Sequence, residues 1–158
     1  MGFWDSIAGK ILYTFFVSMI PVVELRGAVP VGYAGGLNIW VAVAVSIIGN
    51  LLPVPFIIIF IRRIFAFIRR VSPKFNGLIS RLEKRAQNKS EVVKKYSFFG
   101  LFLLVAIPLP GTGAWTGALV AAMLDMRLKR ALPAITAGVF TAGIVVAFLT
   151  CGANALFF

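Results

Sequence analysis

Two opposite charges stand alone in the first third of this sequence, because Glu24 and Arg26 are the only charged residues between Lys10 and Arg62. An arginine at the centre of a lipid bilayer costs at least about 2.5–3.5 kcal/mol, so groups of this kind face other protein groups or a water-filled cavity. In an extended segment, residues two apart point to the same side. Both side chains would then address one cavity, which makes them the first candidates for chemistry.

The two side chains suit different tasks. The planar guanidinium of Arg26 offers a fork of donors that matches an anionic group such as a phosphate, which predicts a substrate-binding role. Burial favours the neutral form of a carboxyl group, so Glu24 is predicted to contact the substrate and to take up and release a proton. A structural ion pair that pins the loop is the alternative, and both interpretations can hold together.

A second segment rich in proline and glycine, residues 108–117, carries no charge. Its glycines allow a close approach of the backbone, and helix ends at such a break expose unpaired N–H and C=O groups. We predict substrate contacts from Gly111, Thr112, Gly113 and Trp115. The four-residue spacing of Gly113 and Gly117 is equally typical of helix packing. The residues predicted to shape the two breaks are Pro21, Gly27, Pro30, Pro108, Pro110 and Gly117.

The composition indicates that a membrane surrounds these segments. The chain has 158 residues, of which 60% are hydrophobic, and its mean hydropathy is +0.97; soluble domains hold about 45–50% apolar residues. Three uncharged runs, residues 37–61, 96–124 and 131–158, exceed the roughly 20 residues that a helical span needs. No cleavable signal peptide is expected, and the single cysteine, Cys151, is interpreted as a packing residue.

The formal net charge of +11 is concentrated rather than spread. Most cations fall between Arg62 and Lys95, and three more are Arg127, Lys129 and Arg130. This clustering follows the positive-inside rule and predicts contact with anionic lipid headgroups, whereas nucleic acid is not an expected partner.

These patterns predict an all-α integral membrane protein with one membrane domain. The predicted order is an interfacial helix (1–10), a re-entrant hairpin (11–37), a span (39–61), a basic cytoplasmic linker (62–95), a second hairpin (96–124) and a second span (131–150). As one helix, residues 96–124 would be about 43 Å long, too long for a core of about 30 Å. Residues 75–96 are predicted to form an amphipathic helix on the membrane surface; a solvated linker is the alternative.

The order of broken hairpin and span occurs twice, with Ile20-Pro21 aligned on Ile107-Pro108. The charge rule gives the two units opposite orientations and places both termini outside, and such inverted repeats are a recurring transporter architecture. A topology of four full spans is the alternative. Because broken helices need neighbours to cover freed backbone groups, we expect a homodimer or a larger assembly.

Motifs for other functions are missing from the sequence. It holds no histidine, no metal-ligand cluster, no Walker motif and no hydrolase triad. We therefore expect no enzymatic activity, no cofactor and no metal site. A secondary transporter driven by a proton or ion gradient is the function that fits.

The two breaks also resemble a known family. The stretches IPVVELRGAVP, residues 20–30, and IPLPGTGAWTG, residues 107–117, are similar to the signature segments of the small multidrug export protein family. This family more distantly resembles the DedA superfamily of membrane transporters. The resemblance implies two facing re-entrant loops and transport across the cytoplasmic membrane of a prokaryote. DedA relatives are associated with translocation of undecaprenyl phosphate, although the charged residues of their second loop have no counterpart here.

Three hypotheses follow for the function. The first is a proton- or ion-coupled translocator, a flippase, of a lipid with a phosphate headgroup. The second is an exporter of small cationic or amphipathic drugs, attracted by Glu24. The third is a membrane-organising protein that does not transport and whose basic helix recruits anionic lipid.

Overall fold

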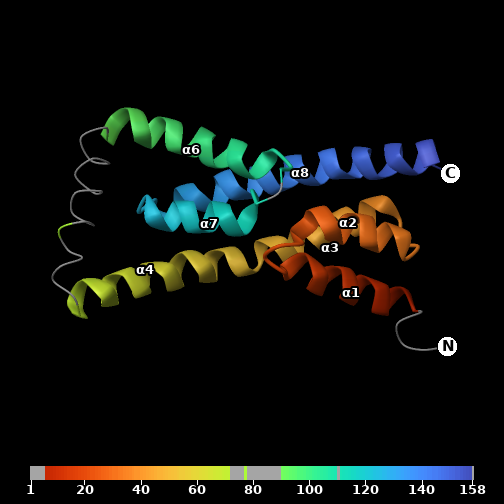
Figure 1. Cartoon of the computed structure of the whole chain (residues 1–158), viewed down its shortest axis with the longest axis horizontal. Helices are drawn as coiled ribbons and strands as arrows, with labels where there is room; N and C mark the ends of the chain where they lie inside the picture. The colour runs from red at the N-terminus through yellow and green to blue at the C-terminus, as the bar shows by residue number, and fades with distance from the viewer. Residues whose placement is uncertain (1–5, 72–76, 78–89, 110, 158) are drawn as a thin grey trace.

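The computed structural model describes residues 6–71, 77, 90–109 and 111–157 (Figure 1). This part of the chain is helical and contains no strand. Its helices are α1 (Ile7–Met19), α2 (Glu24–Ala34), α3 (Ile39–Leu51), α4 (Pro53–Val71), α6 (Ser90–Ala106), α7 (Ala114–Met123) and α8 (Leu128–Phe157). Two helical stretches, Ile39–Ile64 and Leu128–Ala153, are long and apolar enough to cross a membrane. The all-helical class predicted from the sequence is confirmed for the described residues.

Several predicted boundaries differ from the observed ones. Helix α1 begins at Ile7 and runs through residue 11 without interruption, so no separate interfacial helix precedes the first arm within the described residues. Helix α6 begins at Ser90, before the uncharged run that starts at residue 96. Most of the predicted amphipathic helix over residues 75–96 lies outside the described residues.

The first span is divided by proline. Helix α3 ends at Leu51 and α4 begins at Pro53, because Pro53 and Pro55 have no N–H groups to continue the hydrogen-bond ladder. Helix α4 continues beyond residue 61, the expected end of the span, to Val71 and carries the half-buried Arg62. The stretch that is apolar enough to cross a membrane ends at Ile64. Arg62 forms an ion pair of 3.3 Å with Asp125 and donates a hydrogen bond to the Met126 carbonyl.

The same pattern of helix ends occurs twice in the chain. After α2, Gly36 adopts a φ of 88° and the Leu37 N–H donates to the Gly32 carbonyl at 3.0 Å. After α7, Asp125 adopts a φ of 50° and the Met126 N–H donates to the Ala121 carbonyl at 2.9 Å. Both are helix caps closed by a left-handed residue, and their residue numbers differ by 89.

The left-handed position distinguishes the two caps, because glycine adopts it freely and aspartate does so at a cost. We expect Asp125→Gly to leave the free energy of unfolding unchanged or to raise it by up to about 1 kcal/mol. The lost ion pair contributes little, since the Asp125 side chain is 80% exposed. Asp125→Val should instead lower it by about 1–2 kcal/mol. Thermal unfolding in detergent micelles measures both, and a larger loss for glycine than for valine would contradict this account.

Close helix contacts repeat with nearly the same spacing. A Cβ at Gly49 of α3 would lie 2.6 Å from the Phe15 carbonyl oxygen, and one at Gly138 of α8 would lie 2.9 Å from that of Phe102. The two glycines are 89 residues apart and the two carbonyls 87 apart. The spacing of 87 equals the offset between Ile20 and Ile107, and the spacing of 89 is two residues larger.

The two halves of the molecule pack against each other through their second arms. Helix α2 contacts α8, α4 contacts α7, and α3 contacts α8. The shared core includes fully buried Val29, Val54, Ile58, Ile135 and Val139. The start of α1 and the end of α8 lie at one end of the molecule, and the end of α4 and the start of α6 lie at the other (Figure 1).

Candidate functional site

The two breaks meet near the middle of the long axis, where the first turn of α2 lies against the segment between α6 and α7 (Figure 1). Pro21 lies in the first break, and Pro108 lies in the second. The hydrogen bonds that join the breaks come from the two charged side chains singled out in the sequence.

Arg26 binds the C-terminal side of α6. Its Nη1 donates to the Leu109 carbonyl, and its Nη2 donates to the Ile107 carbonyl at 3.2 Å and to Thr112 Oγ1 at 2.9 Å. These carbonyls follow the last turn of a helix, where backbone acceptors lack helical partners and the dipole is negative. Three of the five guanidinium N–H donors are therefore used, and at most two remain for a ligand.

Glu24 binds the N-terminal side of α7. Its Oε1 accepts a hydrogen bond from the Trp115 N–H at 3.2 Å, and the side chain is only 4% exposed. A helix N-terminus offers free N–H groups and a positive dipole end, which suit a carboxylate. The two opposite charges of α2 thus complement the two ends of the second break.

Gly113 makes the contact with Glu24 possible. A Cβ at this position would lie 1.8 Å from Glu24 Oε2. Gly113 also has a φ of 151° and a ψ of −166°, a region that is essentially restricted to glycine. Glu24 itself has a φ of 50°, so the strained backbone of this contact is that of Glu24, whereas glycine adopts its conformation freely.

The expectation that Glu24 and Arg26 lie in an extended segment is wrong. Glu24 and Arg26 both lie in the first turn of α2, where residues two apart point in different directions around the helix. In the described part of the chain no ion pair joins them, and the salt bridge found there is that of Arg62 with Asp125. Arg26 and Glu24 each form their own hydrogen bonds to the second break instead of one ion pair with each other.

Of the other predicted site residues, Thr112 and Gly111 lie on the Arg26 side of the second break and Trp115 lies on the Glu24 side. Thr112 lies in the second break and bonds Arg26; Gly111, with a φ of 82°, lies beside it and accepts a hydrogen bond from Thr116. Trp115 donates its backbone N–H to Glu24, and its buried indole Nε1 has no hydrogen-bond partner among the described residues.

Three residues predicted to shape the breaks lie inside helices instead. Gly27 and Pro30 belong to α2, and Gly117 belongs to α7. Gly117 serves packing, because a Cβ there would lie 2.6 Å from the Val105 side chain. Pro110 lies outside the described residues.

The sequence interpretation missed a set of buried polar residues. Ser46 and Asn50 of α3 are fully buried, and Ser46 Oγ and both polar atoms of Asn50 have no hydrogen-bond partner in the part of the chain that the structure describes. Their four-residue spacing in an uncharged span is the signal that could have revealed them, since polar groups inside a membrane span mark functional positions.

Among the described residues, no group of three or more His, Cys, Asp or Glu side chains could hold a metal ion. The chain matches no curated protein and no solved structure. A model of the family described as "Putative small multi-drug export protein" matches residues 24–145, a range that begins at Glu24, directly after the first break, and includes the second break and most of α8. Since this match covers more than half of the chain, the protein belongs to that family, a family of membrane export proteins.

Proposed function

We propose that this protein is a secondary transporter of the cytoplasmic membrane that moves an anionic substrate, most plainly a lipid with a phosphate headgroup. The observation that carries the proposal is the pair of charged links, from Arg26 and Glu24, between two broken helical segments. The family description supports export as the class of function and favours a transporter over an enzyme.

The arrangement of the helices supports an inverted repeat of two re-entrant hairpins. The hairpin α1–α2 precedes the span α3–α4, and the hairpin α6–α7 precedes the span α8. The hairpins reach the middle of the molecule from opposite ends (Figure 1). Broken elements of this kind supply the binding site near the midplane of many transporters.

Arg26 is the residue through which an anion would act. It is half-buried, whereas Glu24 is almost fully buried, so a ligand reaches the guanidinium more easily. A phosphate would compete with the carbonyls of Ile107 and Leu109 for charge-assisted hydrogen bonds. Binding would release the second break from α2, and this gives substrate-free and substrate-bound states different contacts, as a conformational change requires.

The test is transport in proteoliposomes with a fluorescent prenyl phosphate as the probe. Arg26→Ala should lower the initial rate at least about 100-fold, because hydrogen bonds to charged groups contribute roughly 1.5–3 kcal/mol each. Arg130→Ala is the matched control, since Arg130 is exposed at the start of α8, and its rate should equal that of the unmodified chain.

A second candidate function follows from the family description, which names drugs as cargo. A small cation such as ethidium would then be moved in the same vesicles. Transport of ethidium that requires Glu24 and is unaffected by Arg26→Ala would reject the anionic substrate in favour of this candidate.

A further inference from the structure

Polar residues that are buried as a whole lie in the first half of the described chain. Five such residues are at most 4% exposed, and all lie on α1, α2 or α3. They are Thr14, Ser18, Glu24, Ser46 and Asn50.

The matching positions of the second half are apolar. With the spacing of 87 residues for the first arms and 89 beyond the breaks, the five counterparts are Leu101, Val105, Gly113, Ile135 and Val139. Four of them are core hydrophobic residues. The two halves share a helix pattern, but only the first has polar residues at these buried positions. Packing alone does not require buried polar groups.

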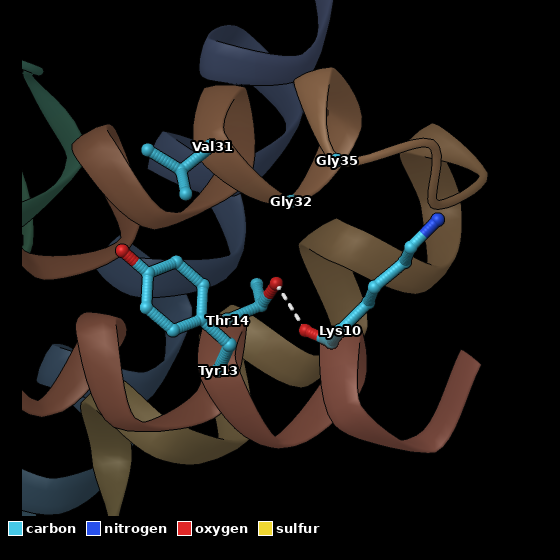
Figure 2. Close-up of a pocket in the computed structure, with 6 residues that line it drawn as sticks. All are labelled: Lys10, Tyr13, Thr14, Val31, Gly32 and Gly35. Carbon is cyan, nitrogen blue, oxygen red and sulfur yellow. Dashed lines mark hydrogen bonds between the residues drawn. The ribbon is translucent and has the colours of Figure 1, made fainter. Parts of the chain in front are cut away.

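A cavity of about 300 Å³ opens at the outer end of this polar interior. It lies between α1 and α2, lined by Lys10, Tyr13, Thr14, Val31, Gly32 and Gly35 (Figure 2). Thr14 borders it and is itself fully buried, with its hydroxyl donating to the Lys10 carbonyl at 2.8 Å. Gly32 leaves room for Thr14, because a Cβ there would lie 2.7 Å from the threonine hydroxyl.

The polar groups continue inward from this cavity. Ser18 lies one turn beyond Thr14 on α1, and a Cβ at Gly49 would lie 2.1 Å from its hydroxyl. Gly49 stands directly before Asn50 and three residues after Ser46. Within the described ranges, three atoms of the Ser46 and Asn50 side chains have no hydrogen-bond partner, namely Ser46 Oγ, Asn50 Oδ1 and Asn50 Nδ2.

Asn50, the innermost of these polar residues, lies at the same height along the α2–α3 hairpin as Glu24. Helices α2 and α3 pack against each other on either side of a short turn, and Glu24 and Asn50 are each 13 residues from Leu37 in that turn. Buried polar atoms without protein partners are commonly bonded to internal water, which needs two to four polar neighbours. Ser46 and Asn50, about one turn apart on α3, supply a hydroxyl, an acceptor and a donor as such polar neighbours.

We propose that Thr14, Ser18, Ser46 and Asn50 hold a chain of water molecules that carries protons between the Lys10 cavity and Glu24. The proposal rests on the proposed function, for which it supplies the proton route. A proton enters from the cavity, passes along the water chain and resides on the Glu24 carboxylate until it leaves by the same route or by the second break. The matching positions in the described part of the second half are apolar, so the water chain reaches Glu24 from the Lys10 end of the molecule.

Silver ion, which is small, hydrated and reactive with thiols, probes the route without any substrate. Ser18→Cys and Ser46→Cys are made one at a time in a chain that carries Cys151→Ala, and the full-length protein is placed in vesicles. The matched controls are the counterparts Val105→Cys and Ile135→Cys. Thiols that remain after a timed exposure are counted by maleimide labelling in denaturant.

We expect silver to react at least about 100 times faster at the two serine positions than at the two controls. Adding Asn50→Val, which introduces the residue type found at the matching position Val139, should slow the reaction of the Ser46→Cys variant at least tenfold. Equal rates at the serine and control positions would overturn the proposal, and if the Asn50 variant does not fold, the four single-cysteine rates still decide. Slow reaction of silver at the serine positions, together with Arg26-dependent transport of the prenyl phosphate, would reject only the water chain. Fast reaction of silver without such transport would reject only the proposed function.

Discussion

Gly113→Ala is expected to abolish folding or transport. The added Cβ would lie 1.8 Å from Glu24 Oε2, a separation that requires the buried carboxylate or the start of α7 to move. Overpacking of this kind costs about 1–3 kcal/mol, and a residue other than glycine at a φ of 151° adds about 1–3 kcal/mol of strain. The measurement is the yield of folded protein and its thermal midpoint in detergent micelles.

Gly111→Ala is the matched control for this prediction. Gly111 also has a positive φ, of 82°, but a Cβ there would meet nothing within 4 Å among the described atoms. It should therefore show only the strain and retain a higher midpoint than Gly113→Ala. Combining Gly113→Ala with Glu24→Ala should recover part of the lost stability, because it removes the clashing carboxylate. Equal midpoints for the two glycine variants would contradict the close contact.

Glu24→Gln is expected to separate stability from transport. Glutamine has nearly the same shape and keeps an oxygen that accepts the Trp115 N–H, so the fold should survive with a loss of about 1–2 kcal/mol. It carries neither a charge nor an exchangeable acid proton, and the proposed proton coupling should be lost. The measurement is uptake of the prenyl phosphate with and without a pH gradient across the vesicle membrane.

The expected result is that the gradient accelerates transport by the unmodified chain at least tenfold and has no effect on the Glu24→Gln variant. Glu24→Asp provides the control, since a shorter acid retains the proton while its reach to Trp115 is reduced. A variant with glutamine that still responds fully to the gradient would exclude Glu24 as the coupling group. In that case the carboxylate would serve only to cap α7.

The match between the two halves was visible in the sequence only in outline. Hydropathy and proline placed two broken segments before two apolar spans, because the pattern of apolar runs and helix breakers is local. The alignment on Ile20 and Ile107 gives an offset of 87 residues, whereas the caps at Gly36 and Asp125 are 89 residues apart. A left-handed aspartate in place of glycine hides this correspondence from sequence comparison.

The sequence by itself determined that Glu24 and Arg26 are isolated charges in an apolar region, that proline and glycine interrupt the chain near residues 21 and 108, and that the fold is helical. These conclusions depend on residue type and near neighbours alone. The tertiary structure decided that the two charges lie in a helical turn and bind opposite ends of the second break, and that Glu24 requires Gly113. It also decided that Asn50 is buried with no hydrogen-bond partner among the described residues. The contacts between Glu24 or Arg26 and the second break join residues more than 80 positions apart, and no local pattern specifies which backbone atoms such distant residues meet.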